Sequence, residues 1–72
     1  DYRKRDLTAP VKIGNYLVVG DFEGYLHFLN IENGKTEGRF RAGRSQIVEL
    51  KVFENTLASL DNAGRLTYLE VN

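Results

Sequence analysis

The chain has 72 residues, with ten basic residues, ten acidic residues, one histidine and no cysteine, so its formal net charge is zero. This length allows at most one domain, the lack of cysteine excludes disulfides, and the balanced charge gives no overall field that would attract nucleic acid or anionic lipid. No apolar run approaches the roughly 18–20 residues of a membrane span. The N-terminal stretch DYRKRDLTAP is charged and lacks the apolar core of a signal peptide, so we expect any targeting information to lie upstream or to be absent.

Taken in chain order, short runs of strand-forming residues separated by turn residues predict seven strands. They cover residues 9–14, 16–20, 25–31, 36–42, 46–54, 56–60 and 65–71. The strand at 36–42 is more polar than those before it, as an exposed edge strand would be. We expect tight turns at 14–15 and 54–55, and a further turn at Asn33–Gly34.

The two halves of the chain repeat each other with a spacing of 40 residues. A shift by 40 without a gap superimposes identical or similar residues in the pairs Ile13/Phe53, Asn15/Asn55, Leu17/Leu57, Asp21/Asp61, Gly24/Gly64, Leu26/Leu66, Phe28/Tyr68, Leu29/Leu69 and Ile31/Val71. Any two hairpins can share Asp, Gly and Leu, but here the register also holds at the paired asparagines. A period near 40 in a β-rich sequence is typical of propeller blades.

Each unit contains the same kind of turn, DFEG at 21–24 and DNAG at 61–64. An aspartate at the first position of a type I turn accepts hydrogen bonds from backbone amides two residues on, and a glycine at the fourth position takes the positive φ that other residues resist. We interpret as structural turn residues, rather than as a binding site, the set Asp21, Gly24, Asn33, Gly34, Asp61 and Gly64.

These features predict an all-β chain made of about one full four-stranded propeller blade and most of the next. Residues 9–45 form the full blade, residues 46–72 form a partial final blade, and residues 1–8 are the end of a preceding blade or a connector. A propeller needs about four to eight blades, and a blade buries its two apolar faces only against neighbours. We therefore expect either the C-terminal part of a larger propeller or a ring of several copies, and we favour the first.

The run LTAPVKIGNYLVVGDFEGYLHFLNIENGK resembles the last full blade of the BamB family of outer-membrane assembly lipoproteins. The resemblance covers residues 7–72 and is strongest over 7–35. It implies an eight-bladed propeller that acts as a non-catalytic scaffold, without a cofactor, and docks onto the barrel-forming core subunit of the outer-membrane assembly machine. It also implies a location on the periplasmic face of the outer membrane, with a lipid anchor upstream of these residues. The partner-contacting loops of the family lie in middle blades, so we assign no contact residue.

Blades of the family resemble those of pyrroloquinoline-quinone (PQQ) dehydrogenases, and a fragment of such a quinoprotein is the first alternative function. The dehydrogenase blade motif A-x-D-x-x-T-G-x-x-x-W falls here on Phe28, Asn30, Asn33, Gly34 and Gly38, and only its glycine agrees. The chain has no tryptophan, so the stacking belt of dehydrogenase blades is missing. This mismatch disfavours a quinoprotein.

No residue pattern indicates an enzyme or a metal site. His27 lies in a strand without a cysteine partner, and Ser45 and Ser59 have no elbow or triad context. The glutamates are scattered over different turns and strands, as solvated charges usually are: Glu23, Glu32, Glu37, Glu49, Glu54 and Glu70. We therefore predict no catalytic, cofactor-binding or metal-ligating residue.

Two basic clusters leave a second alternative open, a small β-barrel that binds nucleic acid. They are Arg3, Lys4 and Arg5 at the start, and Arg39, Arg41 and Arg44 around the polar strand. The cluster around the polar strand also fits an outer strand that charge protects from edge pairing. With zero net charge and no interleaved aromatic residues we favour that structural interpretation over binding of nucleic acid or an acidic protein surface.

Overall fold

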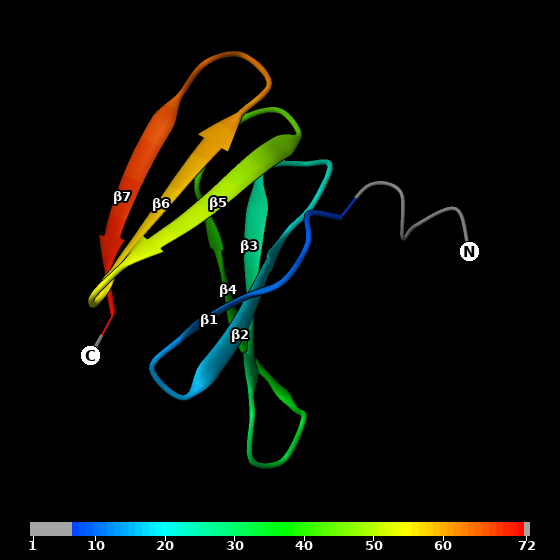
Figure 1. The fold of residues 1–72 in the computed structure, drawn as a ribbon. Coiled ribbons are helices and arrows are strands. Elements are labelled where there is room, and N and C mark those ends of the chain that lie inside the picture. Colours follow the sequence, from blue (N-terminus) through cyan, green and yellow to red (C-terminus); the bar gives the residue numbers. More distant parts are fainter. Residues whose placement is uncertain (1–6, 72) are drawn as a thin grey trace.

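The computed structural model describes residues 7–71, which form two antiparallel sheets (Figure 1). The first sheet has the order β1 (Val11–Ile13), β2 (Tyr16–Gly20), β3 (Tyr25–Asn30) and β4 (Thr36–Arg41). The second has the order β5 (Ile47–Phe53), β6 (Thr56–Asp61) and β7 (Leu66–Glu70). All seven predicted strands are present with their ends within two residues of the prediction, and residues 7–71 contain no helix that could cross a membrane.

The 40-residue repeat reappears in the backbone hydrogen bonds. The carbonyl of Asn15, in the tight turn between β1 and β2, accepts a bond of 3.0 Å from the amide of Ile31. At the same place in the second unit, the carbonyl of Asn55 accepts a bond of 2.7 Å from the amide of Val71. The paired asparagines therefore close each three-stranded meander at the same point.

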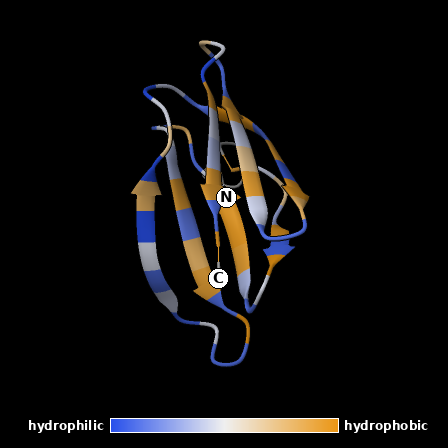
Figure 2. Ribbon diagram, turned by 90° about the vertical axis from the view of Figure 1, so that its left-hand side faces the viewer, coloured by the Kyte–Doolittle hydropathy of each residue, from blue (hydrophilic) through white to orange (hydrophobic). Residues whose placement is uncertain are grey.

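The hydrophobic core lies between the two sheets. Its buried side chains come from β1, β2 and β3 on one side and from β5 and β6 on the other, with one from the connection: Ile13, Val18, Leu26, Ala42, Ile47 and Leu57. Hydrophobic and hydrophilic residues alternate along several strands, so each sheet has an apolar face (Figure 2). The Tyr16 and Phe28 rings pack edge to face at 5.8 Å beside this core.

Equivalent residues of the two sheets differ in burial, and the difference shows how the sheets stack. Leu26 is 1% exposed in the core, whereas its repeat partner Leu66 is 54% exposed. Conversely, Leu57 is 0% exposed, whereas its partner Leu17 is 38% exposed. We call the face of each sheet that carries Leu26 or Leu66 its front face, and the face that carries Leu17 or Leu57 its back face. The front face of the first sheet therefore packs on the back face of the second. The corresponding front of the second sheet and back of the first remain open.

Candidate functional site

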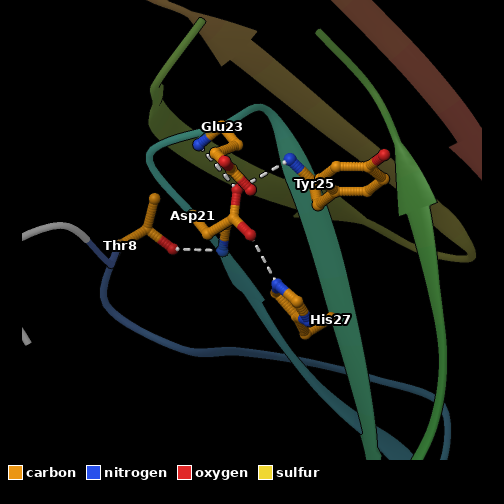
Figure 3. A network of polar contacts seen from close by, with 6 residues as sticks. Thr8, Asp21, Glu23, Tyr25 and His27 are labelled. Carbon is orange, nitrogen blue, oxygen red and sulfur yellow. Dashed lines mark hydrogen bonds and ion pairs between the residues drawn. The ribbon is translucent and has the colours of Figure 1, made fainter. Parts of the chain in front are cut away.

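The first predicted turn is built around the carboxylate of Asp21 (Figure 3). Its Oδ1 accepts hydrogen bonds of 2.9 Å from the backbone amides of Glu23 and Tyr25, and Gly24 has a φ of 97°. Its Oδ2 lies 2.7 Å from Nε2 of His27 on β3. Within residues 7–71, the hydrogen-bonding partners of this carboxylate therefore all belong to the hairpin itself.

The second turn repeats this geometry at Asp61. Its Oδ1 accepts hydrogen bonds from the amides of Ala63 at 3.1 Å and Arg65 at 2.7 Å, and Gly64 has a φ of 91°. Its Oδ2, however, accepts the backbone amide of Arg44 at 3.2 Å, which comes from the connection between the sheets. Asp61 therefore shapes its own hairpin and also ties it to the preceding segment.

Both aspartates have lowered pKa values. Burial raises the pKa of Asp21, but the hydrogen bonds from His27 and from the two turn amides outweigh it, so the pKa lies below its ordinary value of 3.8. For Asp61 the hydrogen bond from the Arg65 amide is the largest cause, and with the other amide bonds it outweighs the effect of burial. Both groups are anionic at neutral pH, and their charge is matched to backbone donors.

The third predicted turn, at Asn33 and Gly34, lies on the surface between β3 and β4. The side-chain Oδ1 of Asn33 accepts the amide of Lys35 at 2.9 Å, and Gly34 has a φ of 72°. The amide of Gly34 donates to the carbonyl of Asn30 at 2.8 Å. The two residues thus satisfy the backbone of an exposed loop.

The remaining polar residues that the sequence singled out are not brought together. The partner of His27 is Asp21, whereas Ser59 is buried in β6 and Ser45 accepts the amide of Ala63 at 3.1 Å through its Oγ. The glutamates stay on separate elements, as expected. Within residues 7–71 no three His, Cys, Asp or Glu side chains are placed to hold a metal ion.

Two of the three basic residues around the polar strand, Arg41 and Arg44, lie at the seam between the two sheets. Arg41 at the end of β4, Arg44 in the connection and Arg65 before β7 line an open cavity of about 370 Å³, together with the buried Ala42 and Gly43. Sequence reasoning did not find Arg65, because only the stacking of the sheets brings it close. The N-terminal cluster of Arg3, Lys4 and Arg5 lies outside the described residues.

Tyr25 orders two of the arginines on the outer side of the first sheet. The guanidinium carbons of Arg39 and Arg41 lie 4.8 Å and 5.1 Å from the centre of its ring. Such cation–π contacts are worth about 0.5–1 kcal/mol each at exposed sites. Arg41 is held further by a hydrogen bond of 3.0 Å from its Nε to the carbonyl of Gly43.

The glycines at the seam permit the close approach of the two sheets. A Cβ atom on Gly43 would overlap the Asp61 side chain, and one on Gly20 would overlap the side chain of Ile47. A Cβ atom on Gly24 would overlap the backbone of Gly43. At the seam, therefore, the Gly24 position packs against the Gly43 backbone, whereas Gly20 and Gly43 leave room for the side chains of Ile47 and Asp61.

Comparison with known proteins shows which proteins the chain resembles. No protein-family model matches it. It is 37% identical over 70 residues to the outer membrane protein assembly factor BamB of Legionella pneumophila, covering 97% of this chain and 18% of that protein. It is 44% identical over 66 residues to BamB of Alkalilimnicola ehrlichii, covering 90% of this chain and 17% of that protein.

The crystal structure of BamB from Moraxella catarrhalis matches with a TM-score of 0.85 and 34% sequence identity, over 97% of this chain and 20% of that one. Together with the antiparallel sheets, this match confirms the predicted β-propeller blades. The chain spans less than a fifth of the length of the curated relatives that it matches.

Proposed function

We propose that this BamB-like chain supplies two adjacent blades of a non-catalytic propeller scaffold that serves the assembly of outer-membrane proteins on the periplasmic side of the outer membrane. The relatives that it matches over most of its length are named for that process. The polar residues that could suggest catalysis are engaged in turns and hydrogen bonds of the hairpins, with Asp21 and His27 as the clearest case. The chain's role is then to hold a surface in a fixed shape.

The observation that carries the proposal is the open front face of the second sheet. It presents the apolar residues Ala58, Leu60, Leu66 and Tyr68, flanked by Glu49 and Lys51, around a shallow cavity of about 250 Å³. Through the repeat, Leu66 and Tyr68 correspond to Leu26 and Phe28, which pack against the neighbouring sheet in the first blade. A face with this pattern fits a following blade of the same type.

The back face of the first sheet fits a preceding blade by the same reasoning. Its Leu17 corresponds to Leu57, which the neighbouring sheet buries completely in the second blade. We therefore propose that further blades cover both open faces in a longer propeller with eight blades. Such a rigid ring presents its loops on wide faces, and we propose that a protein partner, the barrel-forming core subunit of the assembly machine, docks there. Neither a quinoprotein dehydrogenase nor a nucleic-acid-binding barrel is favoured by these features.

A chimera tests the proposal. The 72-residue chain replaces the matched segment of Legionella pneumophila BamB, and the chimera is expressed in a strain that lacks its own BamB. We expect the chimera to restore the level of folded outer-membrane proteins and to co-purify with the core subunit. A chimera that is folded and abundant but restores neither would contradict the proposal.

A matched pair of variants tests whether the open face of the second sheet is covered in the propeller. The same chimera with Leu66→Asp places a charge on the face that is open in this chain but covered in the ring. We expect this variant to lose propeller stability and function together. The conservative change Glu32→Asp, at an exposed loop position, should leave both unchanged.

A further inference from the structure

The cavity at the seam between the sheets has an unusual concentration of positive charge for a chain with zero net charge. Three arginines, Arg41, Arg44 and Arg65, line its volume of about 370 Å³. They come from three separate segments: the end of β4, the connection and the residue before β7. A neighbouring cavity of about 380 Å³ shares Arg41 and Arg44 and adds Phe22, Glu23 and Tyr25.

The positive charge in this cavity is not neutralised by an ion pair within residues 7–71. None of the three arginines has a carboxylate oxygen within 4 Å in that part of the chain, where the ion pairs are His27 with Asp21 and Lys51 with Glu49. Asp61 accepts hydrogen bonds from the backbone amides of Arg44 and Arg65, and Glu23, which lines the neighbouring cavity, forms no ion pair with an arginine within residues 7–71. Within residues 7–71, the guanidinium groups therefore have no carboxylate partner, and apart from Arg41 Nε, which donates to the Gly43 carbonyl, their donors can serve a ligand.

The site is also partly preorganised. Arg41 is fixed by the carbonyl of Gly43 and by the Tyr25 ring, and the backbones of Arg44 and Arg65 are fixed by the Asp61 carboxylate. Less side-chain entropy is lost on binding when the donors are already held in place. The planar fork of a guanidinium matches a carboxylate with two parallel hydrogen bonds.

We propose that the cavity formed by Arg41, Arg44 and Arg65 binds an acidic, carboxylate-bearing peptide segment of a protein partner. The proposal rests on the proposed scaffold function and names the chemistry of one docking point. The cavity is large enough for one or two side chains, which suits a short Asp- or Glu-containing segment rather than a polynucleotide. The ring of Tyr25 is already occupied by Arg39 and Arg41, so it offers no open surface for stacking a base.

The test is a titration of the isotope-labelled 72-residue chain with a synthetic peptide of alternating glutamate and serine, followed by nuclear magnetic resonance. We expect the Nε–Hε signals of Arg41, Arg44 and Arg65 to shift together, and the affinity to weaken as salt is added. Each single Arg→Gln change should weaken binding by about 3- to 10-fold, as expected for the loss of one partly exposed, charge-assisted contact.

Several controls make the result decisive. A peptide with glutamine in place of glutamate should not bind, and the variants Lys12→Gln and Lys51→Gln, which remove exposed cations elsewhere, should bind within about twofold of the unchanged chain. Circular dichroism of each variant verifies that it is folded. Equal binding of the glutamine peptide, unchanged binding by the arginine variants, or preferential binding of a single-stranded oligonucleotide would each overturn the proposal.

The outcome is separable from that of the scaffold proposal. A chimera that restores outer-membrane protein assembly while the chain ignores the acidic peptide removes only the docking site. A chain that binds the peptide at the three arginines supports the docking site whether or not the chimera restores assembly.

Discussion

Substitution of Gly24 by alanine should destabilise the chain much more than substitution of Gly64, although the repeat places both glycines at the same turn position. Both have a positive φ, 97° and 91°, which is unfavourable for alanine. At Gly64 an added Cβ atom meets nothing within 4 Å. At Gly24 it would lie 2.6 Å from the carbonyl carbon of Gly43, on the backbone of the connection to the second sheet.

The expected magnitudes follow from these two environments. A left-handed conformation costs a non-glycine residue about 1–2 kcal/mol, and alanine regains about 0.4–1 kcal/mol by restricting the unfolded chain, so Gly64→Ala should cost about 1 kcal/mol. Gly24→Ala carries the same cost plus about 1–3 kcal/mol for displacing packed backbone. The displacement also strains the bonds of 2.9 Å and 3.1 Å that the Gly24 carbonyl accepts from the amides of Ala42 and Gly43.

Urea unfolding measures both variants, with far-ultraviolet circular dichroism and tyrosine fluorescence as independent probes. A chain of this size has a small free energy of unfolding. The series is therefore measured in sucrose, which stabilises the folded state so that the variants are folded in the absence of urea. We expect the free energies of unfolding of the two variants to differ by about 1–3 kcal/mol at an unchanged m value. Equal losses within about 0.5 kcal/mol would refute the close packing of the turn against the connection.

Three further predictions follow from burial, charge and backbone conformation. Leu26→Ala should lower the free energy of unfolding by about 2–5 kcal/mol, whereas Leu66→Ala, at the exposed repeat position, should lower it by less than about 1 kcal/mol in the same urea assay. Because the folded pKa of Asp21 is lowered, its stabilising contribution is present above its ordinary pKa of 3.8 and is lost as the pH falls through the folded value. The Asp21→Asn variant should therefore lose less stability between pH 5 and pH 2 than the unchanged chain. An identical dependence of stability on pH in the two chains would contradict this. Glu54 has a φ of 54° at the repeat position of Gly14, so Glu54→Gly should raise the thermal midpoint by a few degrees, and a lower midpoint would count against strain at this residue.

The sequence predicts local structure well because the hairpin signals are local. The aspartate and glycine of each turn and the alternation of apolar residues are sufficient to predict the strands and their order. Which face of each sheet is buried cannot be predicted in the same way, because Leu26 and Leu66 are the same residue in the same pattern and only the neighbouring sheet distinguishes them. The contact between Asp21 and His27 can be expected from the sequence, because Asp21 begins the hairpin turn and His27 lies near the start of the strand that follows it.

The second turn shows how a structural residue can support a binding surface without belonging to it. The Asp61 carboxylate accepts hydrogen bonds from the backbone amides of Arg44 and Arg65 rather than from their guanidinium groups. It therefore fixes the backbone at these residues without using their side-chain donors. In the first turn the free oxygen of Asp21 goes to His27, and the repeat position of Arg65 is Tyr25. The repeated turn thus has the same architecture twice but supplies a cation to the seam only once. A fold built from repeats can acquire a local binding site in this way, through a few changed residues beside an unchanged turn.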